Sequence, residues 1–353
     1  MPAPHARVTQ RMIADIAGVS QSTVSLVLNG KADETRRIPP ATRDRVLDVI
    51  RETTYVANPV ARSLVGATND LIGVFTYEPA FPNRSSDFYT PLLTGIESAA
   101  EHVRADLLVF TSTPVVNGRR RLFHESNRLR LADGCILLGR EMDADELERL
   151  LDTEYPFVAI GRRDAADGRV PYIGVDYASA TQELVQRALD LGHTRFGLLR
   201  LPLGAESSRD RHTGIVAALT GAGLDTADAL VETTVTDHRT VADAWEAIRA
   251  SSPTVVLVED PDDGEALLDL LVATDHDVPH DLSVIVLGEH TRHRDRGTDV
   301  TRLSAPRTEL GARAVAALTE RIAAVQRGAV PPPVQELLAC TLVDGTTLGP
   351  PAR

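Results

Sequence analysis

The sequence has few of the residues that disulfide frameworks and aromatic-rich sites require. Among 353 residues there are two cysteines, three methionines and one tryptophan, and only 4% of the residues are aromatic. Cys135 and Cys340 lie in apolar, strand-like runs and are too few for a multi-disulfide framework. No apolar run approaches the roughly 18–20 residues needed to span a bilayer, and residues 1–10 contain no apolar core of a signal peptide. We therefore expect a cytoplasmic protein.

Common motifs of cofactor and catalytic sites are also missing. The sequence contains no G-x-G-x-x-G, Walker loop or G-x-S-x-G elbow. His290 and His293 have no cysteine or third histidine nearby, so we interpret their segment as a solvated loop rather than a metal site. The acidic run 259–265 lacks the spacing of a calcium loop and fits the start of a helix. We expect no catalysis, no metal and no cofactor.

The charges that are present divide the chain unevenly. The composition, 43% hydrophobic and 25% charged, is that of a soluble globular protein, and the length predicts two or three folding units. The net charge is −13, yet residues 1–66 hold nine Lys/Arg and six Asp/Glu and so carry a net +3. A small basic head on an acidic body suggests a nucleic-acid contact confined to the head.

Residues 9–29 have the pattern of two short helices around a tight turn. Thr9 and Ser20 are suited to cap the two helices, and Gly18 suits the left-handed conformation between them. Apolar residues follow at helical spacing: Ile13, Ile16 and Ala17, then Val24, Val27 and Leu28. A third amphipathic helix is expected over residues 40–53. This is a helix-turn-helix, whose second helix enters the major groove and offers Gln21, Ser22, Thr23 and Ser25.

A further short helix is bracketed by Asn58, Pro59 and Gly66, which are typical of a helix cap, a first helical residue and a helix end. A helix of about seven residues is not stable alone in water. We expect it to be ordered only against a partner.

These residues resemble the lactose-repressor (LacI/GalR) family. The resemblance rests on the run from Ala14 to Ser25, on Leu28-Asn29-Gly30, on 41–43, and on Tyr55 with Asn58-Pro59 and 61–64. It implies base reading by Gln21 and Ser22, a hinge helix from Asn58 to Gly66, and an apolar wedge, Leu64, in the minor groove. The implied DNA-contact set is Thr9, Ser20, Gln21, Ser22, Thr23, Ser25, Asn29, Arg36, Arg37, Tyr55, Asn58, Arg62 and Leu64. Leu26 departs from the arginine that many members carry, and the segment with Arg36 and Arg37 is longer than usual.

From Leu71 onward, short apolar runs alternate with amphipathic stretches. The expected strands are 71–75, 107–110, 135–138, 157–160, 172–175, 196–199, 255–258 and 284–287, with further strands near 337–343. The expected helices are 93–104, 121–130, 144–151, 180–191, 211–222, 240–250, 264–273 and 310–327. This alternation is typical of doubly wound parallel sheets covered on both faces. The family resemblance continues here, through Asp190-Leu-Gly-His193 and Arg209-Asp-Arg211, and implies two α/β lobes joined by three crossovers, similar to periplasmic binding proteins, with a ligand in the cleft.

The candidate effector residues lie in loops after these strands, where open α/β sheets bind ligands. Tyr77, Phe81, Phe88 and Tyr89 form a local aromatic cluster, which is either a platform for a sugar or nucleoside or part of a lobe core. Arg211 aligns with the family's cleft arginine. Glu259 and Glu289 depart from the Asn-Asp pair and the aspartate that the family usually carries at these sugar-binding positions. The extra carboxylates either favour a cationic or hydroxyl-rich ligand or indicate that small-molecule sensing has drifted. The complete candidate set is Tyr77, Phe81, Phe88, Tyr89, Arg162, Arg211, Glu259 and Glu289.

The sequence therefore predicts an α/β protein with an N-terminal all-α helix-turn-helix head and a two-lobed, doubly wound, periplasmic-binding-protein-like effector domain. The expected domains are 1–57 for DNA binding, 58–68 for the hinge helix and linker, and 69–353 for effector binding and dimerisation. We expect a transcriptional regulator, most often a repressor in this family, that binds pseudo-palindromic operator DNA as a homodimer and responds to a sugar-like effector. The alternatives are a solute-binding protein of a transport system and an enzyme on a doubly wound fold. Effector identity and operator sequence stay open.

Overall fold

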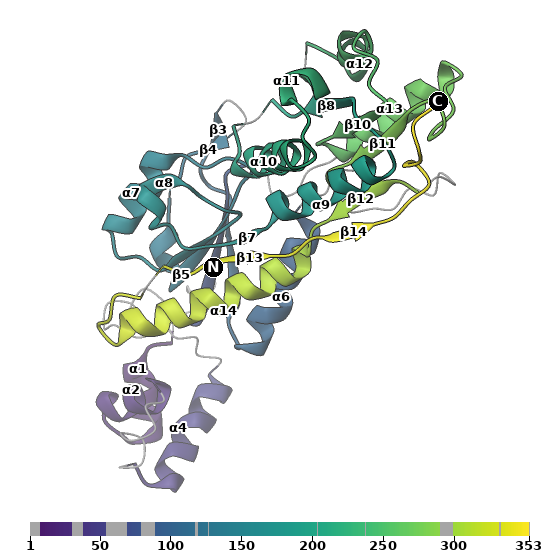
Figure 1. Ribbon diagram of the computed structural model, residues 1–353. Coiled ribbons are helices and arrows are strands. Elements are labelled where there is room, and N and C mark those ends of the chain that lie inside the picture. Colours follow the sequence, from purple (N-terminus) through teal and green to yellow (C-terminus); the bar gives the residue numbers. More distant parts are fainter. Residues whose placement is uncertain are drawn as a thin grey trace. The chain divides into compact units, whose positions relative to one another are not determined.

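The computed structural model in Figure 1 describes residues 8–29, 38–53, 69–78, 89–116, 119–125, 127–202, 204–236, 238–289, 299–331 and 333–352. Contacts within the chain divide it into two units, Met1–Asn69 and Asp70–Arg353. Several predictions lie outside the described residues: the hinge helix and the 290–293 loop, and the candidates Arg36, Arg37, Tyr55, Asn58, Arg62, Leu64, Phe81 and Phe88.

The first unit contains the helix-turn-helix that the sequence predicts. Helix α1 (Gln10–Ala17) begins at Thr9, whose side chain accepts a hydrogen bond from the Met12 amide at 3.3 Å. It ends at Gly18, whose φ of 64° is the left-handed conformation that glycine adopts without strain. Helix α2 (Gln21–Asn29) begins after Ser20, whose Oγ accepts from the Thr23 amide at 3.2 Å. The predicted caps and turn are confirmed.

Helix α4 (Pro40–Glu52) closes the core of this unit. Arg45 from α4 donates from Nε to the Ala17 carbonyl at 2.9 Å, which satisfies a carbonyl at the end of α1. One core prediction is wrong, because Ile16 is 59% exposed. Ile13 and Ala17, four residues apart, lie on the buried face of α1, and Ile16 lies outside that face. The buried core residues are Ile13, Ala14, Ala17, Val24, Val27, Val46 and Val49.

The second unit contains two six-stranded sheets, one in each lobe. The sheet of lobe 1 has the order β13-β7-β6-β5-β1-β2 and that of lobe 2 the order β14-β12-β11-β10-β8-β9. All pairings in both sheets are parallel except β12 with β14. The strands are β1 (Leu71–Thr76), β2 (Asp106–Phe110), β5 (Gly134–Leu138), β6 (Phe157–Ile160), β7 (Tyr172–Val175), β8 (Phe196–Arg200), β9 (Leu230–Thr234), β10 (Val255–Val258), β11 (Ser283–Val286), β12 (Thr301–Ser304), β13 (Gln335–Leu338) and β14 (Thr341–Val343). The predicted doubly wound class is confirmed.

Helices cover both faces of each sheet, so the central strands are buried throughout. In lobe 1, α6 and α14 pack together on one face and α7 and α8 lie on the other; in lobe 2, α9 and α10 oppose α12 and α13. The helices are α6 (Thr90–His102), α7 (Ala144–Asp152), α8 (Ala165–Gly168), α9 (Tyr177–Asp190), α10 (Glu206–Gly221), α11 (Thr226–Ala229), α12 (Val241–Arg249), α13 (Pro261–Ala273) and α14 (Arg307–Gln326). Helices α9 and α10 approach so closely at Gly214 that a Cβ there would lie 2.3 Å from the Ala178 carbonyl oxygen.

The chain passes between the lobes three times, as the family resemblance implies. It crosses from β7 to α9, from β12 to α14, and from β13 to β14. Cys340 therefore lies in the last crossover rather than within a strand, whereas Cys135 is buried in β5, and both are free thiols. Because three segments of the chain connect the lobes, covalent connections as well as contacts hold them next to each other.

One sequence expectation of the second unit is wrong, and two strands of its sheets were not expected. Residues 121–130 do not form a helix: after the hairpin of β3 (Val115–Val116) and β4 (Arg119–Arg120), the described part of this segment contains only the short 3₁₀ helix Leu129–Leu131. Strands β9 and β12 were not predicted, because their sequences are too polar to read as buried strands.

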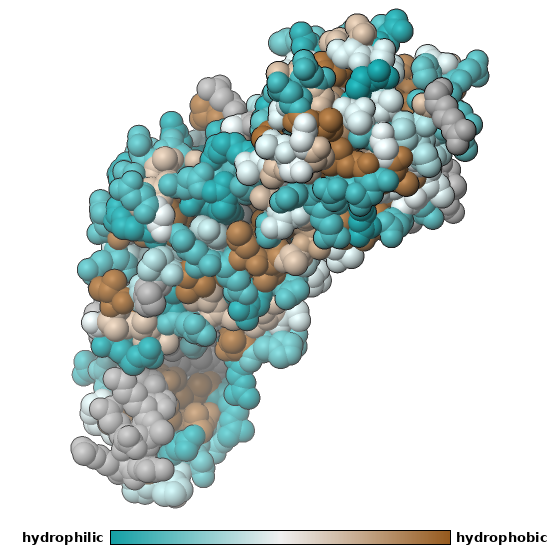
Figure 2. All heavy atoms as spheres, in the orientation of Figure 1, coloured by the Kyte–Doolittle hydropathy of each residue, from teal (hydrophilic) through white to brown (hydrophobic). Residues whose placement is uncertain are grey.

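In the orientation of Figure 2, hydrophilic residues cover most of the surface of this unit and hydrophobic residues are scattered among them. Among the described residues, no helix is both long and apolar enough to cross a membrane.

Candidate functional site

A cavity of about 130 Å³ lies between the lobes at the carboxyl ends of their strands. Its walls come from the loops after β5, β6, β10 and β11 and from the start of α10 and α14. This is where open parallel sheets bind ligands, since loops from several strands converge there. Of the predicted effector residues, five line the cavity: Tyr89, Arg162, Arg211, Glu259 and Glu289.

Tyr77 does not line the cavity, so this prediction is corrected. Its side chain is 2% exposed and packs edge-to-face against Phe75, with ring centroids 5.2 Å apart, in the core between the sheet and α7. Tyr77 directly follows β1 and comes two residues after Phe75, so both side chains point to the same sheet face. Burial, and then the nearby carboxylates of Glu146 and Asp143, raise the pKa of Tyr77 well above its usual value. Tyr77 is therefore part of the core of lobe 1 and not part of a platform for a sugar or nucleoside.

Tyr89 belongs to the cavity wall and is fixed by Glu78. Its hydroxyl donates to Glu78 Oε2, and the Glu78 carboxylate also accepts from the Arg140 amide at 3.1 Å. Burial, followed by the charge of Glu78, raises the pKa of Tyr89 well above its usual value. The ring is therefore held neutral and oriented at the wall.

Glu259 is the most buried acid of the cavity wall. It is 2% exposed, and its Oε2 accepts from the Leu201 amide at 2.9 Å and from Ser208 Oγ at 2.5 Å. Its Oε1 is buried and accepts no hydrogen bond from the described residues. A buried acceptor without a donor costs about 1–3 kcal/mol, and more when it is charged. A ligand that supplies a donor to Oε1 removes that cost.

Arg211 lines the same wall and is also buried, at 8% exposed. It donates from Nε to the Leu287 carbonyl at 2.9 Å and from Nη1 to the Ser207 carbonyl at 3.2 Å. Its guanidinium stacks 3.8 Å from the centre of the Tyr177 ring, and no described carboxylate forms an ion pair with it. The guanidinium is thus held rigidly by neutral groups and keeps donor capacity for a ligand.

Glu289 and Arg307 form the wall on the side of α14. The Glu289 carboxylate accepts from Arg302 at 3.3 Å and from Ser304, and its backbone carbonyl accepts from Arg307. Burial lowers the pKa of Arg307, and the neighbouring positive charges of Arg140 and Arg211 lower it further. Glu289 therefore organises the end of β12 and the start of α14 rather than leaving its carboxylate open.

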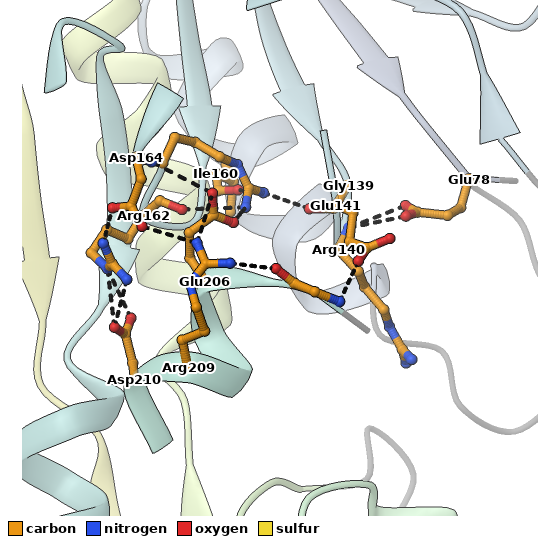
Figure 3. A network of polar contacts seen from close by, with 12 residues as sticks. Glu78, Gly139, Arg140, Glu141, Ile160, Arg162, Asp164, Glu206, Arg209 and Asp210 are labelled. Carbon is orange, nitrogen blue, oxygen red and sulfur yellow. Dashed lines mark hydrogen bonds and ion pairs between the residues drawn. The ribbon is translucent and has the colours of Figure 1, made fainter. Parts of the chain in front are cut away.

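A network of charged side chains joins the lobes beside the cavity (Figure 3). Arg162 of lobe 1 donates from Nη2 and Nε to the Asp210 carboxylate of lobe 2, at 2.7 to 3.1 Å. Arg163 donates to Glu206 at 2.9 Å, and to the carbonyls of Gly139 at 2.6 Å and Ile160 at 2.9 Å. The hydrogen bond with Asp210 is the largest cause of the raised pKa of Arg162.

Three further contacts extend this network. Arg209 pairs with Asp164 at 2.9 Å, the Gly204 amide donates to Glu141, and Arg140 lies 3.8 Å from Asp260. Each of these contacts joins one lobe to the other. Together they hold the two lobes against each other across the cleft.

Several wall and network residues were missed by sequence reasoning. The residues concerned are Arg140, Arg163, Tyr177, Ser208, Asp210 and Arg307. For Asp210 a signal existed, because it lies between Arg209 and Arg211 in the motif that carried the resemblance. For the others, the sequence shows only isolated polar residues after strands.

Four of the predicted DNA contacts of the head lie in the first five residues of α2. Gln21 and Ser22 are exposed and Thr23 and Ser25 are half-buried. Ser20 hydrogen-bonds Ser22 Oγ at 2.7 Å and Thr23 Oγ1 at 2.9 Å, so it organises the first turn of the helix. Thr9 is exposed at the start of α1. Asn29 ends α2, and its side chain lies outside the described residues.

Two family models match the chain. Residues 11–58 match "Bacterial regulatory proteins, lacI family", and residues 185–348 match "Periplasmic binding protein-like domain". The chain is 28% identical over 324 residues to the HTH-type transcriptional regulator CelR of Thermobifida fusca, covering 90% of this chain and 92% of CelR. It is 28% identical over 320 residues to catabolite control protein A of Priestia megaterium, covering 87% and 90% of the two chains.

Solved structures agree with the observed fold. A structure described as a complex of the transcriptional regulator CelR with cellobiose is 26% identical, covers 97% of this chain and 100% of its own, and superposes with a TM-score of 0.65. The lac repressor dimer bound to operator and an anti-inducer is 21% identical, covers 98% and 100%, and has a TM-score of 0.73, which shows likeness of fold.

Proposed function

Because the chain belongs to the LacI family of DNA-binding transcriptional regulators, we propose that it binds a pseudo-palindromic operator as a homodimer under the control of a sugar-like effector in the cleft. The match of the head to the family model favours this function over the solute-binding protein of a transport system, which needs no DNA-binding head. A single head contacts only a few base pairs, and a two-fold dimer doubles the number it reads.

The effector proposal rests on two groups in the same cavity wall: a hydrogen-bond acceptor without a donor and a rigidly held donor. Glu259 Oε1 is buried without a donor, and Arg211 has donor capacity that no described carboxylate uses. A hydroxyl group donates one hydrogen bond and accepts others, so a polyol with neighbouring hydroxyls serves both groups. The cellobiose complex of the similar CelR supports a sugar as the class. In this proposal Tyr89 presents its ring to an apolar sugar face.

For the DNA contacts, we propose that Gln21 and Ser22 read base edges from the exposed side of α2. Ser20, Thr23, Ser25 and Thr9 then contact phosphates or orient the helix, with Asn29 at its end. The predicted contacts at Arg36, Arg37, Tyr55, Asn58, Arg62 and Leu64 remain part of this proposal through the family resemblance.

Effector control requires that the ligand bind one arrangement of the lobes better than another. The ion pairs between the lobes form only in the arrangement in which the lobes meet beside the cavity. A ligand that contacts both lobes favours this same arrangement, so its affinity differs between the two states. Coupling of 1–3 kcal/mol is typical, which is about a 5- to 150-fold change in operator affinity.

A mobility-shift titration tests the proposal. The full chain is titrated against DNA from upstream of its own coding region, alone and with a panel of mono- and disaccharides that includes cellobiose. We expect a retarded complex containing two chains, whose affinity changes at least fivefold with one sugar. A monomeric complex, or unchanged affinity across the panel, contradicts the dimer or the sugar effector respectively.

A further inference from the structure

The exposed side of helix α2 carries one large apolar residue, Leu26. It is 36% exposed and lies one turn after Ser22, on the same side of the helix, whereas Val24 and Val27 point into the core. Helix α2 contains no charged residue over its nine positions. Its exposed side therefore offers short polar groups at the first turn and an isobutyl group one turn later.

An apolar side chain on a base-reading surface has one chemical partner in the major groove. The edges of all four base pairs present hydrogen-bond donors and acceptors there, and only thymine adds an apolar group, its C5-methyl. Against a G·C pair, Leu26 would cover polar atoms of the base edges without hydrogen-bonding them, which costs free energy. Against thymine, it gains the burial of a methyl group.

We propose that Leu26 reads the C5-methyl of a thymine and makes an A·T pair a fixed position of each operator half-site. The proposal rests on the proposed function, in which α2 is the helix that enters the major groove. Four residues of helix rise about 6 Å, and base pairs are stacked about 3.4 Å apart. Because this rise is the largest separation along the DNA axis that the helix allows, the thymine lies within about two base pairs of the pair that Ser22 faces.

The first step of the test finds the operator without assuming it. The full chain selects binding sites from a random duplex pool, and so do Leu26→Ala, Leu26→Met and Leu26→Arg. We expect the parent and Leu26→Met to select the same A·T pair. Leu26→Arg should select G·C at that position, because arginine pairs with the guanine edge. Leu26→Ala should lose preference at that position alone.

The second step removes only the methyl group. Deoxyuridine replaces the selected thymine in one half-site, and affinity is measured by fluorescence anisotropy. We expect the parent and Leu26→Met to bind about fourfold more weakly, from about 0.8 kcal/mol for one buried carbon, and Leu26→Ala to bind both duplexes equally. Ile16→Ala is the matched control, since Ile16 is an exposed apolar residue of α1 and should leave the discrimination intact.

The outcomes separate this inference from the function on which it depends. If the parent selects an operator but discriminates against deoxyuridine no better than Leu26→Ala at every selected thymine, Leu26 does not read the methyl and the inference is wrong. If all four proteins select identical sites, it is wrong as well. If the parent selects no sequence at all, the DNA-binding function fails first.

Discussion

The substitution Glu259→Gln separates the ligand-binding role of this side chain from its structural role. Glu259 Oε2 accepts from the Leu201 amide and from Ser208, and a glutamine carbonyl can accept both bonds with the same shape. At the other atom, the amide places a donor where the buried, unpartnered Oε1 stood. A sugar hydroxyl that donates to Oε1 in the parent protein would instead face the NH2 group of the glutamine, which is also a donor.

The two expected effects differ in size. A hydrogen bond to a charged group contributes about 1.5–3 kcal/mol, so effector affinity should fall about 10- to 150-fold. Stability should change by less than about 1 kcal/mol, because the anchoring bonds persist and a buried charge becomes neutral. Glu259→Ala, by contrast, leaves the Leu201 amide and Ser208 without their acceptor and should cost about 1–3 kcal/mol of unfolding free energy.

Isothermal titration calorimetry with the active sugar of the panel, together with denaturant unfolding, measures both effects. Glu232→Gln is the control, since Glu232 is a surface glutamate that pairs with Arg200 away from the cavity. Operator affinity without sugar should match the parent. If Glu259→Gln binds the sugar as tightly as the parent, the unpartnered carboxylate oxygen is not a ligand contact.

Three further predictions test packing, charge and lobe closure. Gly214→Ala should destabilise the chain by about 1–3 kcal/mol or more, because the added Cβ would lie 2.3 Å from the backbone of α9. Gly221→Ala in the same helix is the control, since its Cβ meets nothing within 4 Å, and it should leave the melting temperature unchanged or raise it. Burial and two neighbouring carboxylates raise the pKa of Asp263 to about 6, so unfolding free energy should fall as pH rises from 4 to 6. Denaturant titrations across this range should show the parent losing about 1–2 kcal/mol relative to Asp263→Asn, and parallel curves would refute the assignment. Asp210→Asn removes the negative charge and one of the two acceptor oxygens of the Arg162 pair, whose side chains are 24% and 16% exposed. It should favour lobe opening about 5- to 30-fold. An unchanged distance distribution between spin labels on the two lobes would contradict this.

Local features of the sequence account for the elements that were predicted correctly. The apolar strands β6, β7 and β10 lie where their runs of buried-type residues place them. The caps at Thr9 and Ser20 and the turn at Gly18 were also predictable, because a cap acts on backbone groups two or three residues away. Asp260 similarly caps α13 at the acidic run that the sequence interpretation assigned to a helix start.

The elements that were missed depend on neighbours distant in the chain. Strand β12, Thr301–Ser304, is half polar, and it becomes a strand because β11 pairs on one side and β14 on the other. The expected helix over 121–130 had a suitable apolar pattern, but Leu122 is instead fully buried beside Glu146, whose carboxylate accepts from the Leu122 and Phe123 amides. Tertiary contacts override local propensity in both cases.

Local sequence patterns were enough to predict the helix-turn-helix head and the doubly wound sheets, and the family resemblance implied two lobes with a ligand-binding cleft between them. Periodicity, helix caps and motif spacing depend on residues that are close together in the chain, so the amino-acid sequence is enough to recognise them. The three-dimensional arrangement was needed to place Tyr77 in the core and Tyr89 at the cavity, and to bring Arg162 to Asp210, 48 residues away. Those assignments depend on which sheet face a side chain takes and on how two lobes meet, because burial and ion pairing are set by residues that only folding brings together.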